Sequence, residues 1–325
     1  MKEPIFLKPI FQEKIWGGSR LRDVYNYPIK SLLTGECWAI SAHPNGESSV
    51  RCGKYKGLGL GELWDNHRKI FGYYGSQEFP LLTKIIDANE DLSVQVHPND
   101  DYAKEYENGE SGKTECWYII DCTEGADIII GHHAQTKQEF INKIKSGSWD
   151  QLLQRIKIKP GDFFYIPSGT LHAICKGTLL LETQQNSDTT YRVYDYNRRN
   201  KNGHLRELHL QKALDVITIP HKERKSNPNL LQTNGATITT FIEGKYFTVA
   251  KWVIKDQLSM KQDQPFMLFS VIEGKGVLKT GGQKYELYKG DHFILPYELG
   301  DFNIKGNIQI IVSHPSSNIE RKIDK

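Results

Sequence analysis

Short runs of apolar and aromatic residues, bounded by Gly, Pro, Asn and Asp, recur along most of this chain. Such runs are typical of β-strands, and many of them at close spacing favour a sandwich or jelly roll over a sheet with alternating helices. The predicted strands fall in two sets: residues 92–96, 116–120, 127–130, 163–166 and 178–182, and then residues 247–254, 267–272, 276–279, 292–295 and 308–312.

Three other segments have the period of a helix. Residues 61–71, 137–156 and 208–216 place apolar side chains three and four positions apart, which predicts helices there. All three lie in the first two thirds of the chain. The pattern therefore predicts a mainly β protein with a few helices inserted in its N-terminal part.

The two sets of strands belong to an internal repeat. Residues 159–172 read KPGDFFYIPSGTLH, and residues 289–301 read KGDHFILPYELGD. Upstream, CWYIIDCTEG (116–125) has a counterpart in LFSVIEGKG (268–276). Similarity at two matched places indicates two copies of one β-rich unit.

The copies differ in their polar side chains. Counted from the Gly-Asp of each copy, His172 lies opposite Asp301 and Glu115 lies opposite Met267. The second copy has kept the strands and lost the side chains that bind metals. We therefore expect only the first copy to be active.

A polar, proline-containing segment separates the copies. HKERKSNPN (221–229) has the composition of a linker. We predict a catalytic, metal-binding unit at 1–220, a linker at 221–232 and a C-terminal unit without metal ligands at 233–325.

Composition narrows the classes of partner. The formal net charge is +3, from 42 Lys and Arg against 39 Asp and Glu. So balanced a charge argues against nucleic acid or a membrane surface as the main partner, but it allows a small anionic ligand where a few cations converge. No obligatory protein partner is inferred.

Features of targeting are also missing from the sequence. It has no transmembrane run of eighteen apolar residues, and the N-terminal segment lacks the apolar core of a signal peptide. Its five cysteines form no CxxC pair. A reduced, cytoplasmic protein is the expectation.

Two strand segments carry candidate metal ligands. In LSVQVHP (92–98), side chains alternate, so Ser93, Gln95 and His97 share one face. In the next segment Lys113 and Glu115 share a face, and a carboxylate that points inward must be paired or must bind a metal. Taken singly, the first segment could equally be a half-exposed strand with a surface His, and for the second a surface pair of Lys113 and Glu115 would be the commoner outcome.

The third element is GDFFYIPSGTLH (161–172), which resembles the second signature of the cupin superfamily, G-x5-P-x-G-x2-H. That resemblance implies a jelly-roll barrel and, with the repeat, a double cupin. The Asn that often follows in the signature is replaced by Lys176. The cupin His is His172, which brings a second imidazole to the candidate ligand set.

Gln95, His97, Glu115 and His172 together suit one Zn²⁺ per chain, with room for water or substrate. Iron or manganese would also accept two imidazoles and a carboxylate. Two neighbouring histidines, His132 and His133, precede a helical segment and are expected at the surface.

Long blocks also resemble type I mannose-6-phosphate isomerase (phosphomannose isomerase) in its short bacterial form. They include KIWGG (14–18), TGECWAISAHP (34–44), FPLLTKIIDANEDLSVQVHPND (79–100), LLETQQNSDTTYRVYDYNR (180–198) and GDHFILP (290–296). The resemblance covers nearly the whole chain and implies an enzyme that interconverts mannose 6-phosphate and fructose 6-phosphate.

The resemblance also implies roles for residues. It places the zinc ligands at Gln95, His97, Glu115 and His172 and the active-site arginine at Arg192. The polar residues around that arginine are Ser93, Lys113, Glu182 and Arg198.

Aldose–ketose isomerisation moves a proton between adjacent sugar carbons through an enediol-type intermediate. It needs an electrophile near the carbonyl and hydroxyl oxygens of the sugar, a base next to the two reacting carbons and an anchor for the phosphate dianion. Lys113, Arg192 and Arg198 are candidate phosphate anchors, with Ser93 as a hydroxyl donor, and Arg192 is also suited to stabilise enediolate charge.

The base stays open among Glu182, Lys113 and a metal-polarised water, with Glu182 preferred. Without the resemblance, Arg192 would be interpreted as a surface cation among tyrosines. Two other functions remain open: a different metal-dependent cupin enzyme, such as a dioxygenase or another sugar-phosphate isomerase, and a cupin that binds sugar without turning it over.

Overall fold

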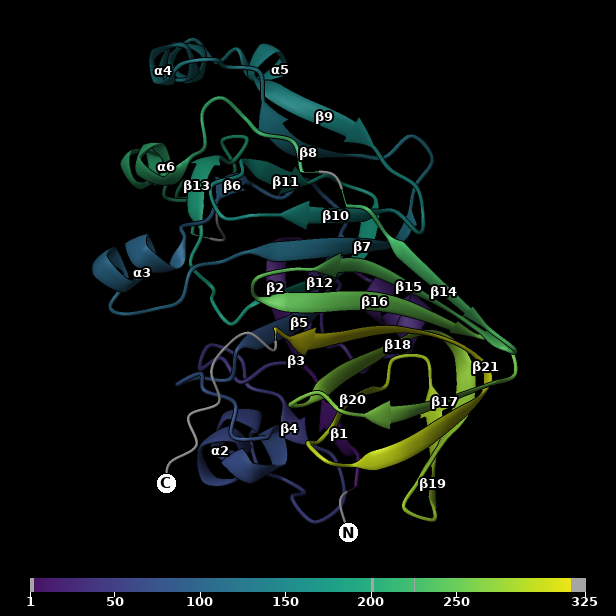
Figure 1. Ribbon diagram of the computed structural model, residues 1–325. Helices are drawn as coiled ribbons and strands as arrows, with labels where there is room; N and C mark the ends of the chain where they lie inside the picture. Colours follow the sequence, from purple (N-terminus) through teal and green to yellow (C-terminus); the bar gives the residue numbers. More distant parts are fainter. Residues whose placement is uncertain (1–2, 200–201, 225, 317–325) are drawn as a thin grey trace.

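The computed structural model describes residues 3–199, 202–224 and 226–316. The structure contains three antiparallel sheets, and short helices lie beside them (Figure 1). The prediction of a mainly β protein with helices in its N-terminal part is confirmed. None of the described helices is long and apolar enough to cross a membrane.

Two of the sheets are built from residues 10–194. The six-stranded sheet has the order β10 (Phe163–Ile166), β7 (Glu115–Cys122), β12 (Thr178–Gln185), β5 (Leu81–Ala88), β3 (Thr34–Ile40) and β2 (Ile10–Gly18). The five-stranded sheet has the order β13 (Tyr191–Tyr194), β6 (Val94–Val96), β11 (His172–Ile174), β8 (Asp127–His132) and β9 (Leu153–Lys157).

Apolar side chains from both sheets form one core between them. Ile86, Ile119 and Leu180 from the six-stranded sheet belong to the same buried cluster as Ile128 and Ile174 from the five-stranded sheet. Alternation explains this packing, because every second residue of a strand points to the same face. The candidate ligands lie on strands of this sandwich.

The third sheet is ten-stranded and comes mainly from the second half of the chain. Its main path has the order β14 (Asn229–Thr233), β15 (Ala236–Glu243), β16 (Phe247–Ile254), β21 (Gly300–Pro315), β18 (Met267–Thr280), β20 (His292–Leu295), β1 (Ile5–Lys8) and β4 (Ser49–Val50). Off this path, β17 (Gln257–Gln262) pairs with β21 and β19 (Gln283–Tyr288) pairs with β18. The segments predicted at 267–272 and 276–279 are one strand, β18, with a register shift between Val271 and Glu273.

The core of the ten-stranded sheet is aromatic and aliphatic. Trp252, Phe269, Phe293 and Phe302 are buried together, and Met267 belongs to the same cluster. The side chain opposite Glu115 in the repeat therefore fills an apolar core.

Short helices connect the strands. They are α1 (Arg20–Tyr25), α2 (Leu60–Asn66), the 3-10 helix η1 (Arg68–Phe71), α3 (Asp100–Tyr106), α4 (Lys137–Lys145), α5 (Trp149–Leu152) and α6 (Leu210–Val216).

The helix predicted over 137–156 is wrong at its C-terminal end. Gly147 has φ +67°, a left-handed conformation that ends a helix, and α4 stops just before it. After the single turn of α5, residues 153–157 form β9, which pairs antiparallel with β8. Tertiary pairing has overridden the local helical pattern there.

The ten-stranded sheet packs against the β10–β7 edge of the six-stranded sheet. Phe163 and Phe241 stack with ring centroids 4.6 Å apart, and Lys251 Nζ donates to Tyr118 Oη at 2.7 Å. Tyr165 meets Phe247 edge to face at 6.3 Å. The two halves of the chain are therefore in direct contact beside β7, the strand that begins with Glu115.

Candidate metal centre and adjoining cavity

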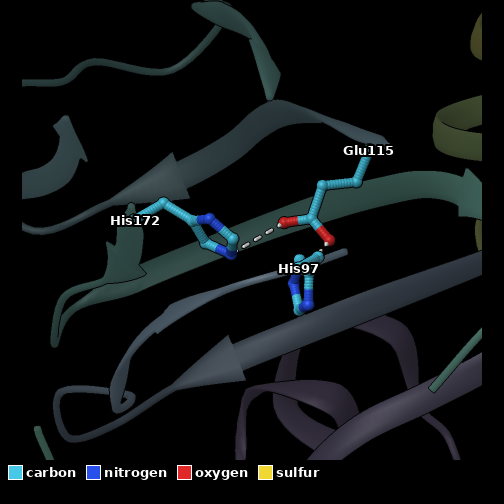
Figure 2. A group of neighbouring side chains, drawn as sticks. All are labelled: His97, Glu115 and His172. Carbon is cyan, nitrogen blue, oxygen red and sulfur yellow. Dashed lines mark ion pairs between the residues drawn. The ribbon is translucent and has the colours of Figure 1, made fainter. Parts of the chain in front are cut away.

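Three buried side chains converge in the first sandwich: His97, Glu115 and His172 (Figure 2). Their ligand atoms all lie within 4.8 Å of one another. The two imidazole Nε2 atoms lie on opposite oxygens of the carboxylate, His172 at 3.3 Å from Oε1 and His97 at 3.4 Å from Oε2. Among the described residues this is the one such group of metal-binding side chains.

Strand register explains this convergence. His172 pairs with Gln95 across β11 and β6, and His97 follows β6 directly, so both imidazoles come from neighbouring strands of the five-stranded sheet. Glu115 begins β7 in the facing six-stranded sheet. The cluster therefore spans the two layers of the sandwich.

Both imidazoles are oriented by backbone carbonyls. His97 Nδ1 lies 2.8 Å from the carbonyl oxygen of Thr189, and His172 Nδ1 lies 2.9 Å from that of Thr170. A carbonyl only accepts, so each Nδ1 carries the hydrogen, and each neutral ring presents the Nε2 lone pair to the common centre. This is the tautomer of a histidine that binds a metal through Nε2.

Burial keeps these imidazoles neutral. It lowers the pKa of His97 to about 3, with help from the neighbouring Lys113 ammonium, and it lowers the pKa of His172 as well. Burial alone would raise the pKa of Glu115, but the adjacent ammonium of Lys113 holds it well below its usual range. The group thus offers two neutral nitrogens and one carboxylate, the donor set that suits Zn²⁺.

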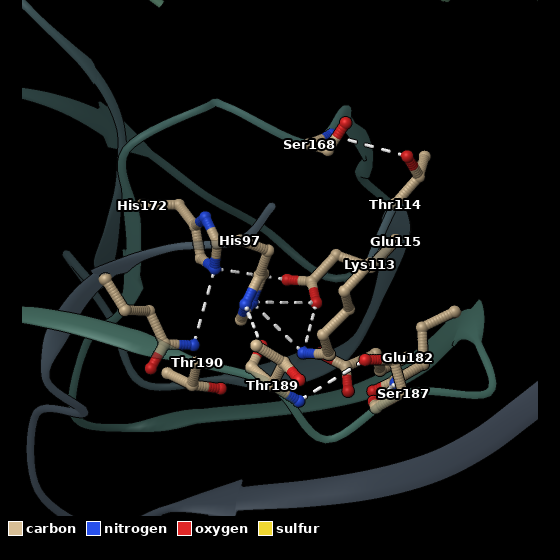
Figure 3. A network of polar contacts seen from close by, with 12 residues as sticks. His97, Lys113, Thr114, Glu115, Ser168, His172, Glu182, Ser187, Thr189 and Thr190 are labelled. Atoms are coloured by element: carbon tan, nitrogen blue, oxygen red, sulfur yellow. Dashed lines mark hydrogen bonds and ion pairs between the residues drawn. The ribbon is translucent and has the colours of Figure 1, made fainter. Parts of the chain in front are cut away.

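Two further observations show that the group fits a cation. Glu115 Oε1 is buried without a hydrogen-bond partner, and an unsatisfied carboxylate oxygen is costly unless a cation meets it. The ammonium of Lys113 already stands at the group, with Nζ 2.6 Å from Glu115 Oε2 and 3.1 Å from His97 Nε2. Figure 3 shows Lys113 at the cluster, which therefore already holds one positive charge.

Gln95 lies next to the cluster. Its Nε2 is 3.4 Å from His172 Nε2, and its Oε1 accepts from Ser93 Oγ at 3.3 Å. A half-turn of the amide would exchange its two polar atoms and present the oxygen toward His172 and the centre.

A cavity of about 240 Å³ adjoins the cluster. It brings together Ser93, Gln95, Lys113, Glu182 and Arg192, all predicted as site residues. It is also lined by Trp16 and by residues that the sequence did not single out for the site: Lys14, Glu36, Lys84, Ile86, Leu92, Ile174, Asp188, Thr190 and Arg206.

Glu182 is a buried carboxyl group on the cavity wall. Trp117 Nε1 donates to Oε2 at 3.0 Å, and Lys84 Nζ lies 3.6 Å from Oε1. Burial, reinforced by the charge of Glu115, raises the pKa of Glu182 above its usual value. A fixed carboxyl group with a raised pKa on a cavity wall has the properties of a general acid or base.

Arg192 enters the cavity from β13, which pairs with β6 at Gln95. Its Nη1 donates to the carbonyl oxygen of Glu207 at 2.8 Å, while its buried Nε has no hydrogen-bond partner. Burial, and then the nearby Arg206, lower the pKa of the Arg192 guanidinium. Part of its donor capacity is therefore left for a bound anion.

Arg198 is not among the residues that line the cavity; Arg206 is. Both arginines are held by the buried Asp195. Arg206 binds it through two hydrogen bonds, Nε to Oδ2 at 2.7 Å and Nη2 to Oδ1 at 2.8 Å. Arg198 Nη2 donates to Oδ1 at 2.5 Å, and its Nη1 donates to the Asp91 carbonyl oxygen.

The cavity residues that were not predicted from the sequence differ in whether a sequence pattern marks them. Lys84 is a charged residue inside a strand that is buried along its whole length, which in the sequence is a cation in the apolar run LLTKIIDA. That pattern could have marked it, because a buried cation needs a reason. Arg206 had no local signal.

The expectation that His132 lies at the surface is wrong. Its side chain is 3% exposed, and its Nε2 lies 3.0 Å from the carbonyl oxygen of Thr218. The strand β8 continues through His132 and carries it inward, whereas His133 is exposed.

Two family models match parts of this chain. The model of the type I phosphomannose isomerase catalytic domain matches residues 5–120, and that of the mannose-6-phosphate isomerase cupin domain matches residues 237–315. The predicted double cupin fold is confirmed by these matches together with the three sheets.

Individual relatives are similar over almost their whole length. Mannose-6-phosphate isomerase ManA of Bacillus subtilis (strain 168) is 56% identical over 312 residues, which cover 96% of this chain and 99% of that protein. Probable mannose-6-phosphate isomerase GmuF of the same organism is 54% identical over 315 residues, which cover 97% and 100%. The crystal structure of the mannose 6-phosphate isomerase from Bacillus subtilis superposes with a TM-score of 0.95 at 57% identity, covering 97% of this chain and 100% of that one.

Proposed function

This chain belongs to the type I phosphomannose isomerase family, and from that membership we propose that it is a zinc-dependent aldose–ketose isomerase that interconverts mannose 6-phosphate and fructose 6-phosphate. The observation that carries the proposal is the convergence of His97, Glu115 and His172 beside a cavity lined by cations. All of the proposed ligands lie within residues 1–220, the predicted catalytic unit.

We assign the metal to His97, Glu115 and His172, with Gln95 as a fourth ligand. The Nε2 lone pairs, the unpartnered carboxylate oxygen and the ammonium at the group support this assignment. Zinc bound there would polarise the carbonyl and hydroxyl oxygens of the sugar. One such group among the described residues fits one ion per chain.

The cations at the cavity would bind the phosphate. A phosphate dianion is best met by guanidinium groups, which can donate two parallel hydrogen bonds. Arg192 and Arg206 both line the cavity, and Ser93 adds a hydroxyl there. Arg198, predicted as a further anchor, would act by holding Asp195 beside Arg206.

We propose Glu182 as the residue that moves the proton between the two sugar carbons. Its carboxylate would take the proton from one carbon and return it to the neighbouring one, while Trp117 and Lys84 hold it in place. The other protein candidate, Lys113, is engaged with Glu115 and His97. Arg192 would stabilise the negative charge that develops on the enediolate oxygens.

A coupled assay tests this function. Metal-replete protein should convert mannose 6-phosphate to fructose 6-phosphate, and chelator treatment should remove the activity until Zn²⁺ is restored. Metal analysis of the same preparation separates the alternatives, since an oxygen-activating cupin needs iron. If the zinc-loaded protein bound sugar phosphate without converting it, the proposed function would be wrong and a sugar-phosphate-binding protein would be the better assignment.

A further inference from the structure

A tyrosine of the ten-stranded sheet reaches the segment that follows the metal cluster. Tyr246 lies in the turn between β15 and β16, and its hydroxyl donates to Asp100 Oδ2 at 2.7 Å. Asp100 is the first residue of α3, which begins shortly after His97. The contact therefore joins the second half of the chain to the metal-binding half.

The other oxygen of Asp100 fixes the start of β7. Oδ1 accepts from the backbone N of Gly112 at 3.0 Å and from Gln185 Nε2 at 2.8 Å. Gln185 Oε1 in turn accepts from the backbone N of Thr114 at 2.9 Å. One carboxylate and one amide thus hold the backbone on both sides of Lys113.

The chain in this region is tightly closed. The backbone N of Lys113 donates to the carbonyl oxygen of Pro98 at 3.0 Å. A side chain at Gly112 would collide with the backbone of Asn99 and Asp100. Because the segments after His97 and before Glu115 touch so closely, a movement of Asp100 must displace the strand that carries the carboxylate ligand.

We propose that Tyr246 is a positioning residue for the metal centre: by fixing Asp100, it holds Gly112 to Glu115 in the place where Lys113 and Glu115 meet His97. The inference rests on the proposed function, through its zinc site, for Zn²⁺ binding and catalysis, and is independent of it for the position of the backbone. It gives the second half of the chain a role in the site, although its own core holds no metal-binding group among the described residues.

The side chain of Asp100 is 41% exposed, so the hydrogen bond from Tyr246 contributes modestly. We expect Tyr246→Phe to weaken Zn²⁺ binding about twofold to fivefold, measured by competition with a chromophoric chelator. Asp100→Ala removes both halves of the link and should weaken Zn²⁺ binding by about tenfold.

A second readout needs neither metal nor turnover. Amide hydrogen exchange in the metal-free protein, followed in a peptide that contains Gly112 and Thr114, should be faster in Tyr246→Phe than in the parent protein. Lys251→Met is the matched control, because it removes another 2.7 Å hydrogen bond between the two halves of the chain, from Lys251 to Tyr118, and leaves Asp100 untouched. Its exchange in this peptide should equal that of the parent.

A double variant tests whether Tyr246 acts on the metal centre through Asp100. If Tyr246 acts through Asp100, adding Tyr246→Phe to Asp100→Ala should change neither Zn²⁺ affinity nor exchange further. Equal exchange and equal Zn²⁺ affinity in Tyr246→Phe and the parent would overturn the proposal. If the parent protein were inactive but exchange were still faster in Tyr246→Phe than in the parent, only the proposed reaction would be contradicted.

Discussion

Replacement of Glu182 by Gln is the sharpest change that the site allows. Gln has nearly the same shape, and its amide oxygen can still accept from Trp117 Nε1, which lies 3.0 Å from the carboxylate in the parent. The substitution removes the group that is proposed to carry the proton and leaves the metal ligands untouched. It therefore separates the chemistry from the binding of zinc.

The expected size of the effect follows from the role. A positioned general base contributes roughly 10²–10⁴-fold to a rate, so kcat should fall by about 10³-fold, or about 4 kcal/mol of activation free energy. KM for mannose 6-phosphate should change little, because the phosphate anchors Arg192 and Arg206 remain.

Stability should change by less than activity. Lys84, which is buried, loses a carboxylate at 3.6 Å, and this opposes folding. The neutral amide, however, avoids the desolvation that raises the pKa of Glu182. These effects have opposite signs, so we expect a change in the free energy of unfolding of about 1–2 kcal/mol at most.

The assay is the coupled isomerase reaction on zinc-loaded protein, with zinc content and urea unfolding measured on the same preparation. Glu36→Gln is the matched control, since Glu36 is another buried carboxylate on the cavity wall and bonds Trp38 Nε1 at 2.6 Å. The control should lose less than about tenfold in kcat. Retention by Glu182→Gln of more than a tenth of kcat would refute the assignment of the base.

Three further outcomes are expected. His172→Ala should lower Zn²⁺ affinity at least about 100-fold in chelator competition, and unchanged affinity would exclude it as a ligand. Asp195→Asn should raise KM for the sugar phosphate about tenfold with a smaller change in kcat, because the amide cannot hold Arg206 through two charged hydrogen bonds; an unchanged KM would contradict this. Burial lowers the pKa of His292, which bonds Tyr27 Oη at 2.8 Å, to about 3, so below about pH 6.5 the unfolded chain binds a proton that the folded chain does not. When the pH falls from 7.5 to 5, the free energy of unfolding of His292→Gln, measured by urea titration, should therefore decrease by about 2 kcal/mol less than that of the parent. An equal decrease would refute this assignment of the pH dependence to His292.

Local patterns predicted the strands well where one face or both are buried. The segments predicted at 163–166, 247–254 and 292–295 match β10, β16 and β20 to the residue. The failure at 153–157 is also physical: apolar residues spaced for a helix were drawn into pairing with β8, and only the partner strand reveals this. Sequence cannot state which strand lies beside which.

The same limit applies to the site. His97, Glu115 and His172 could be proposed because alternation and the cupin signature mark inward-facing polar residues on strands. Register then decides that they meet, through the pairing of His172 with Gln95. Lys84 and Arg206 reach the cavity from segments far apart in the sequence, and no local pattern connects them.

The central claim is that one cation is held by His97, Glu115 and His172. Anomalous diffraction at the zinc edge, from crystals of zinc-loaded protein with measured isomerase activity, tests it directly. The account predicts one peak per chain, about 2.0–2.2 Å from both imidazole Nε2 atoms and a Glu115 oxygen. A fully active crystal with no peak between these three side chains would contradict it.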